Sequence, residues 1–258
     1  MLSSIRKEKK IDVFQEIWFL ACLIFCIVSF FIFAFQEKWL KAWMSAISIA
    51  YVFIPLLLQW LLKFRIHTTL YFFVMLYTVC PLLGYSYDLY HITTWWDKLM
   101  HGFAGIIFAM FGAFLPKFFN KGRPCSFVLC AAFGLFFSIA IAGLWEFIEY
   151  GMDSLFHTDM QKDRFLDALN SYLLGGKVGE IGVINEIQSV IVNGEIQKGY
   201  IDIGLIDTMQ DMIWETVGAV TYTIIYLSTK GQRFSLVSSE RTIDRPLPLS
   251  GDSDNENE

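Results

Sequence analysis

Apolar residues in this chain are gathered into continuous blocks of about 20, the length that an α-helix needs to cross the hydrocarbon core of a bilayer. The blocks do not alternate with polar faces, 55% of the 258 residues are hydrophobic, and the mean hydropathy is +0.48. The sequence therefore predicts an all-α polytopic membrane protein with about six transmembrane helices, at residues 17–35, 41–62, 67–87, 99–118, 126–149 and 206–227.

These blocks divide the chain into five parts. A basic N-terminus (1–16) precedes the first five helices (17–150), a long loop (151–205), the sixth helix (206–227) and a disordered tail (228–258). The N-terminus resembles a signal peptide, but no small-x-small cleavage site follows its apolar stretch, so we expect an uncleaved first span.

Lysine and arginine residues predict the orientation, because cytoplasmic loops carry an excess of them. Most of them lie in the two termini and in the second and fourth loops, which share one side of a six-span arrangement. Both termini are therefore expected in the cytoplasm, and the loop 151–205 is expected outside it.

Charge and cysteine usage exclude several classes of protein. The net charge of −5 owes much to the tail 251–258. The sequence contains no basic patch with interleaved aromatic residues, so nucleic-acid binding is not expected. The cysteines are odd in number, lie in or beside apolar blocks and form no Cys-x-x-Cys pair, which argues against a disulfide framework or a cysteine metal site. We expect small buried hydrophobic side chains at Cys22, Cys26, Cys80, Cys125 and Cys130.

Three acidic segments lie where apolar blocks begin or end: WWDKLMHGFAG (95–105), AGLWEFIEYGMD (142–153) and IDTMQDMIWETVGA (206–219). Their ionisable residues are three or four positions apart, which places each set on one face of a helix. With six spans, all three segments lie at the outer side of the membrane. Ionisable groups there are costly, so a functional site is the expected reason for them. The sets are Asp97 with His101, Glu146 with Glu149, and Asp207 with Asp211 and Glu215.

Helix capping is an alternative explanation for two of these acids. Asp97 and Asp207 stand at predicted helix starts, where a carboxylate accepts hydrogen bonds from free N–H groups and suits the helix dipole. Glu146 and Glu149 lie in the last predicted turn, where the dipole disfavours anions. Glu215 lies about 12 Å along the axis from Asp207, too deep for a cap.

The acids need a neutralising partner, either shared protons, His101 with Lys98, or a divalent cation. Carboxylates with one imidazole suit Mg²⁺, Mn²⁺ or Ca²⁺ better than zinc. The predicted metal ligands are Asp97, His101, Glu146, Glu149, Asp207 and Asp211, and the predicted catalytic residues are His101, Glu146, Asp211 and Glu215.

Three kinds of function remain open. A metal-dependent enzyme or binding site would act on the phosphoryl or acyl group of an envelope lipid or lipid-linked compound, and without metal His101 would serve as a general base. Alternatively the acids form a relay in a cation- or proton-coupled transporter. In the third interpretation they are structural parts of a non-catalytic envelope accessory protein.

The segments around these acids suggest supporting roles. Residues 85–96 are rich in Tyr and Trp and form either an interfacial belt or a binding platform. Small residues at four-residue spacing predict close helix packing; they are Gly105, Ala109 and Ala113, then Gly134, Ser138 and Ala142. In the long loop, residues 163–170 predict a short surface helix and Asn193-Gly194 predicts a β-hairpin. This loop is either a lid over the acids or a passive connection.

At these residues the chain resembles a known group of bacterial membrane proteins. The matching residues are DKLMH at 97–101, Glu146, and Asp211-x-x-x-Glu215-x-x-Gly218-Ala219. They resemble the YjdF-type inner-membrane family and the related VanZ-like family, which is associated with low-level teicoplanin resistance. The VanZ-like pattern usually has Asn where Glu215 stands. The resemblance covers residues 67–227 and implies a multi-pass protein of the bacterial cell membrane with a candidate site, but it names no reaction.

Overall fold

The structure is a computed structural model that describes residues 2–62, 65–120, 123 and 125–231. The chain divides into two compact units, which are described separately. The first comprises Met1–Ser138 with Glu215–Glu258, and the second comprises Ile139–Trp214. Most of the predicted tail 228–258 lies outside the described residues. So do Lys63 and Lys121, two of the basic residues in the second and fourth loops on which the predicted orientation rests.

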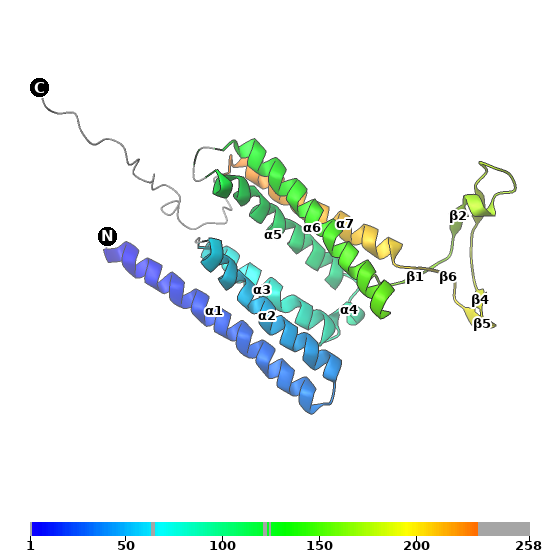
Figure 1. The fold of residues 1–258 in the computed structure, drawn as a ribbon, viewed down its shortest axis with the longest axis horizontal. Coiled ribbons are helices and arrows are strands. Elements are labelled where there is room, and N and C mark those ends of the chain that lie inside the picture. The colour runs from blue at the N-terminus through cyan, green and yellow to red at the C-terminus, as the bar shows by residue number, and fades with distance from the viewer. Residues whose placement is uncertain (1, 63–64, 121–122, 124, 232–258) are drawn as a thin grey trace, which may run out of the picture. The chain divides into compact units, whose positions relative to one another are not determined.

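Helices cover all six predicted segments of the chain (Figure 1). Four are long and apolar enough to cross a membrane, namely Val13–Phe35 of α1, α2, α5 and α6. Helix α3 is shorter, and the acids of α7 lower its hydropathy, so neither belongs to that group. The long helices are α1 (Leu2–Phe35), α2 (Trp39–Leu62), α3 (Thr68–Tyr85), α5 (Trp96–Phe119), α6 (Phe127–Phe156) and α7 (Leu205–Ser228), with the one-turn α4 (Leu89–Ile92) before α5.

Two helices extend beyond the predicted spans. Helix α1 begins at Leu2 rather than at residue 17, and α6 continues to Phe156 rather than ending at residue 149. Glu146 and Glu149 therefore lie inside α6 and not in its last turn. The helix ends where the carboxylate of Asp153 accepts hydrogen bonds from the backbone N–H groups of Met160 and Gln161, at 2.7 and 2.9 Å, and turns the chain.

Helices α1, α2 and α3 pack side by side in the first unit (Figure 1). Small serine side chains let the three helices approach closely. Each hydroxyl can be buried there because it donates a hydrogen bond to a backbone carbonyl one turn earlier in its own helix. Ser29, Ser45 and Ser48 do this at 2.8, 2.9 and 3.0 Å and are buried. Large apolar side chains on α1 point outward instead, with Ile17 61% and Ile24 57% exposed, as expected of a helix surrounded by lipid.

An ion pair joins the first turn of α2 to the loop after α3. The ammonium of Lys41 donates a hydrogen bond to the carboxylate of Asp88, and this bond holds the pKa of Asp88 below its usual range. The pair is partly exposed, so its contribution to stability is about 0.2–1 kcal/mol. That contribution is present above the usual pKa of an aspartate and is lost as the pH falls through the lowered value.

We therefore predict that Asp88→Asn lowers the free energy of unfolding at neutral pH and has no effect in strong acid. Unfolding of both proteins in SDS, followed at several pH values, measures this difference. A constant difference across the pH range would show that the ion pair is not its cause.

The second unit contains short antiparallel strand pairs between α6 and α7. Strand β1 (Arg164–Leu166) pairs with β6 (Tyr200–Asp202), and this pairing joins the start of the loop to its end. Strand β2 (Leu169–Ser171) pairs with β3 (Gly182–Ile184). The predicted surface helix at 163–170 is therefore wrong: so short a helix is marginal alone, whereas both halves of the segment find strand partners.

A two-residue turn connects β4 (Val190–Val192) with β5 (Glu195–Gln197), which pair antiparallel. Asn193 and Gly194 both have positive φ values, 51° and 89°, as a type I′ turn requires. The hairpin thus has the turn that the sequence indicated, while its side of the membrane stays a prediction.

Candidate functional site

The first two turns of α5 carry three ionisable side chains. Asp97, Lys98 and His101 are all largely buried, with side chains 14%, 12% and 11% exposed. Trp95 is the N-cap of α5 and makes no side-chain cap hydrogen bond, so Asp97 lies in the first turn and is not the cap residue. The helix dipole favours a carboxylate at that position.

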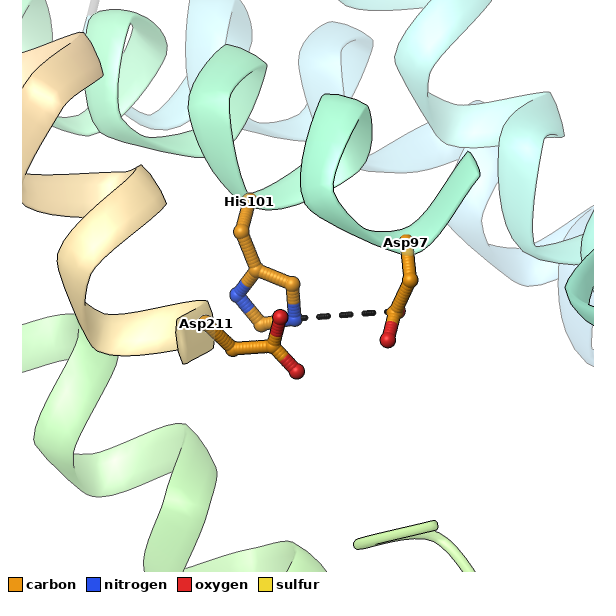
Figure 2. A group of neighbouring side chains, drawn as sticks. All are labelled: Asp97, His101 and Asp211. Carbon is orange, nitrogen blue, oxygen red and sulfur yellow. Dashed lines mark ion pairs between the residues drawn. The ribbon is translucent and has the colours of Figure 1, made fainter. Parts of the chain in front are cut away.

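The imidazole of His101 lies between two carboxylates. Its Nε2 atom is 3.9 Å from Oδ1 of Asp97, one turn earlier on α5 (Figure 2). Its Nδ1 atom is 3.7 Å from Oε2 of Glu215 on α7. Lys98 lies 3.7 Å from the other carboxylate oxygen of Asp97. The structure therefore brings the predicted residues Asp97, His101 and Glu215 together within the first unit.

Close backbone contact between α5 and α7 holds this arrangement. A Cβ atom on Gly105 would lie 2.0 Å from the carbonyl oxygen of Glu215, and one on Gly218 would lie 2.1 Å from that of Gly102. Only glycine fits at such distances. The predicted small-residue face of α5 thus sets the distance between His101 and Glu215.

Helix α6 packs on another side of α5 in the same unit. The hydroxyl of Ser138 donates to the carbonyl of Gly105 at 3.2 Å. A Cβ atom on Gly134 would lie 2.4 Å from the carbonyl oxygen of Ala109. Because α5 is held on both sides, the helix that carries Asp97 and His101 is rigidly placed.

Two buried polar atoms at or beside this cluster have no hydrogen-bond partner among the described residues. Oε1 of Glu215 is buried and accepts no hydrogen bond from the residues that the structure describes. The buried indole N–H of Trp96, beside Asp97 in sequence, likewise has no acceptor among the described residues. Buried polar atoms in proteins nearly always have a hydrogen-bond partner. The Oε1 atom of Glu215 and the indole N–H of Trp96 are therefore available to a ligand.

The remaining predicted site residues belong to the second unit. Glu146, Glu149, Asp207 and Asp211 are all buried there, at 8% exposed or less. Trp145 donates its indole N–H to the carboxylate of Glu149, one turn later on α6, at 2.8 Å. That these four residues join His101 in one site stays a prediction.

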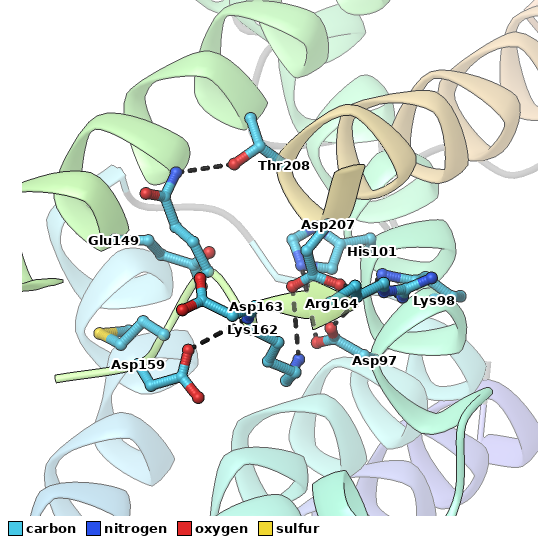
Figure 3. A network of polar contacts seen from close by, with 12 residues as sticks. Asp97, Lys98, His101, Glu149, Asp159, Lys162, Asp163, Arg164, Asp207 and Thr208 are labelled. Carbon is cyan, nitrogen blue, oxygen red and sulfur yellow. Dashed lines mark hydrogen bonds and ion pairs between the residues drawn. The ribbon is translucent and has the colours of Figure 1, made fainter. Parts of the chain in front are cut away.

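Two basic residues of the loop bind Asp207. Nζ of Lys162 lies 3.8 Å from Oδ2 of Asp207, and Nη2 of Arg164 lies 3.4 Å from Oδ1 (Figure 3). The side-chain amide of Gln161 donates to the hydroxyl of Thr208 at 2.7 Å in the same network. These contacts fasten the start of the loop to the first turn of α7.

Asp202, rather than Asp207, caps α7. Its two carboxylate oxygens accept hydrogen bonds from the N–H groups of Gly204 and Ile206, at 2.9 and 3.0 Å. Asp207 thus lies in the first turn of α7, where the helix dipole favours a carboxylate, and is not the cap residue. Sequence reasoning also missed Lys162 and Arg164, although two basic residues two positions apart share one face of an extended segment and were a usable signal.

The loop around these residues is acidic. Partial burial, followed by the nearby carboxylates of Asp159, Asp202 and Asp153, raises the pKa of Asp163 above its usual range.

The fold and the buried cluster define a class of protein: a multi-helix membrane protein with several apolar helices and a buried Asp/His cluster at the start of one of them. The chain belongs to the family described as predicted membrane protein (DUF2238), which matches residues 18–231. The chain matches no curated protein and no solved structure.

Proposed function

We propose that this protein binds a divalent cation, Mg²⁺ or Mn²⁺, through Asp97, His101 and Asp211, and uses it to bind or activate a lipid-linked compound. Each of the three residues offers one ligand atom of a suitable kind. The observation that carries the proposal is the buried imidazole of His101 between the carboxylates of Asp97 and Glu215.

The separation of Asp97 and His101 suits one shared cation. Two atoms that each bind a cation at about 2.1 Å cannot lie more than about 4.2 Å apart. Oδ1 of Asp97 and Nε2 of His101 are 3.9 Å apart, inside this limit, and too far apart for a direct hydrogen bond. A cation bound between them would be held by one carboxylate oxygen and one imidazole nitrogen, a ligand pair that suits Mg²⁺ or Mn²⁺.

The register of α5 against α7 supports Asp211 as the third ligand. Glu215 contacts His101, and Ala219 lies beside Gly105, so the two helices advance together by four residues and run in the same direction. We propose that the same register, one turn earlier, brings Asp211 to Asp97 as a ligand of the same cation. Asp211 shares the buried face of α7 with Glu215, because the two are four residues apart on one continuous helix.

Glu215 has a supporting role in this proposal. A carboxylate on Nδ1 of a histidine keeps the proton there, orients the ring and leaves the Nε2 lone pair for the metal. The 3.7 Å separation from Nδ1 to Oε2 tightens to a hydrogen bond with a small rotation of either side chain. Glu146, Glu149 and Asp207 remain proposed members of the wider site.

The membrane arrangement suggests the substrate class. We propose six spans with both termini in the cytoplasm of a bacterial cell, and residues 151–205 outside the cell membrane as a lid. The start of α5 and the start of α7 then face the outer leaflet, where the phosphoryl or acyl group of a lipid-linked compound reaches the cation. The indole N–H of Trp96 is a hydrogen-bond donor for such a group. The motif resemblance to the YjdF-type and VanZ-like families agrees with an envelope role.

Metal analysis tests the proposal. The protein, extracted in mild detergent without chelator and passed through a desalting column, should retain about one Mn²⁺ per chain after loading. Asp97→Asn should reduce the metal content to background, whereas Asp88→Asn, the same substitution at a partly exposed carboxylate, should leave it unchanged. If the wild type and Asp97→Asn bind the same amount of metal, the site does not bind a cation, and a proton relay or a structural role takes its place.

A further inference from the structure

Two cysteines flank the start of α6 at positions whose side chains meet. The N–H of Cys130 donates to the carbonyl of Ser126 at 3.0 Å, so Ser126 is the residue just before the helix. Cys125 and Cys130 then occupy the positions before the cap and in the second turn. Side chains at these positions pack together in the hydrophobic staple of many helices. The two thiols interact directly, as such a staple requires.

The two thiols differ in access. Cys130 is fully buried, whereas Cys125 is half-buried and lies ahead of the helix. Both are free thiols. An accessible thiol next to a buried partner is the usual arrangement of a pair in which one cysteine reacts first and the other resolves the product.

A cation and an aromatic side chain lie beside the pair. Nζ of Lys117 is 5.7 Å from the ring centre of Tyr226 on α7, and both residues neighbour Cys130. These neighbours distinguish the pair from Cys22 and Cys26, which are buried one turn apart within α1.

We propose that Cys125 and Cys130 form a reversible disulfide, a redox modification site at the start of α6. The thiolate of Cys125 attacks one sulfur of a small disulfide such as oxidised glutathione, forms a mixed disulfide and releases one glutathione thiolate. The thiolate of Cys130 then attacks Sγ of Cys125 and releases the second. The cysteine pair loses two electrons and two protons, and both electrons reduce oxidised glutathione to two thiols.

This inference does not depend on the proposed cation site. In the proposed orientation, the start of α6 faces the cytoplasm, where thiols are normally reduced and disulfides are transient. The bond would form under oxidative stress. It would then close the staple covalently and hold the chain before α6 to the helix.

Thiol counting under a glutathione redox buffer tests the proposal. The protein in mild detergent is equilibrated with a series of oxidised-to-reduced glutathione ratios, quenched with acid, labelled with a maleimide in SDS and weighed by mass spectrometry. Wild type should lose two of its five thiols without gaining the mass of glutathione. The midpoint ratio should be at least about tenfold more reducing than for the same chain oxidised in SDS.

Two variants serve as controls. Cys125→Ser should keep its four remaining thiols at every ratio that oxidises the wild type, whereas Cys22→Ser should still lose two. A stable mixed disulfide with glutathione on Cys125, equal midpoints in detergent and SDS, or loss of two thiols in Cys125→Ser would each overturn the proposal.

Discussion

Gly105→Ala is expected to destabilise the protein by at least about 1–3 kcal/mol, the cost of forcing an extra methyl group into a filled interface. The new Cβ atom would lie 2.0 Å from the carbonyl oxygen of Glu215 and 2.9 Å from the backbone nitrogen of Ala219. Both obstacles are backbone atoms, so α7 as a whole must move away from α5. That movement separates Glu215 from His101, and cation binding should fall together with stability.

Gly143→Ala is the matched control. Gly143 also lies within a long helix, α6, but a Cβ atom there meets no described atom within 4 Å. Alanine favours helix over glycine by up to about 1 kcal/mol, so this change should be neutral or stabilising. Resistance to SDS unfolding measures both variants. Equal stability of the two would mean that α5 and α7 do not pack through Gly105.

Glu215→Gln is expected to lower the affinity for Mn²⁺ by about 10- to 100-fold while the protein stays folded. Glutamine keeps the shape of the side chain but removes the negative charge that orients the His101 ring through Nδ1. Titration of the protein with Mn²⁺, with bound metal separated by rapid desalting, gives the affinity. Glu215→Asp should recover part of the loss, because the shorter carboxylate still carries the charge.

The Mn²⁺ affinity of Glu215→Gln also distinguishes a role of Glu215 in orienting His101 from a purely structural role. If the carboxylate were only a buried charge, its neutralisation would raise stability and leave the affinity for Mn²⁺ unchanged. Glu16→Gln, an exposed glutamate on α1, provides the same change of charge as a control. An unchanged affinity in Glu215→Gln would remove Glu215 from the site.

The sequence predicted the helices well because a membrane span has a fixed minimum length, which uninterrupted apolar blocks reveal. It predicted their ends less well. Helix α6 passes through Glu146 and Glu149 to Phe156, since acidic residues lower hydropathy without stopping a helix. In α7 the acidic residues lower the hydropathy so far that the helix does not count among the clearly apolar spans, although it is continuous from Leu205 to Ser228.

The loop 151–205 was harder to predict because its structure depends on pairing between distant residues. Strand β1 finds its partner β6 only at the other end of the loop, so Arg164–Leu166 was predicted as part of a helix. The hairpin at Asn193-Gly194 was predictable because its signal is local and tied to one turn type.

In the candidate site too, contacts within one helix were predictable from the sequence, whereas contacts between distant segments were not. Helical spacing placed Asp97 and His101 on one face, and the structure sets them 3.9 Å apart. The contact between His101 and Glu215 depends on glycines of α5 and α7, whose pairing the sequence alone does not specify. The partners of Asp207, Lys162 and Arg164, lie about 45 residues earlier in the chain, so their contact with it depends on how the loop folds.

Pulsed electron paramagnetic resonance of the Mn²⁺-loaded protein tests the central claim most directly, because it detects the nitrogen of a coordinated imidazole. The account predicts one bound imidazole nitrogen in the wild type. That signal should disappear in His101→Ala and persist in His91→Ala, where the lost histidine is exposed. A spectrum without coordinated nitrogen, or one that is the same in the wild type and His101→Ala, would contradict it.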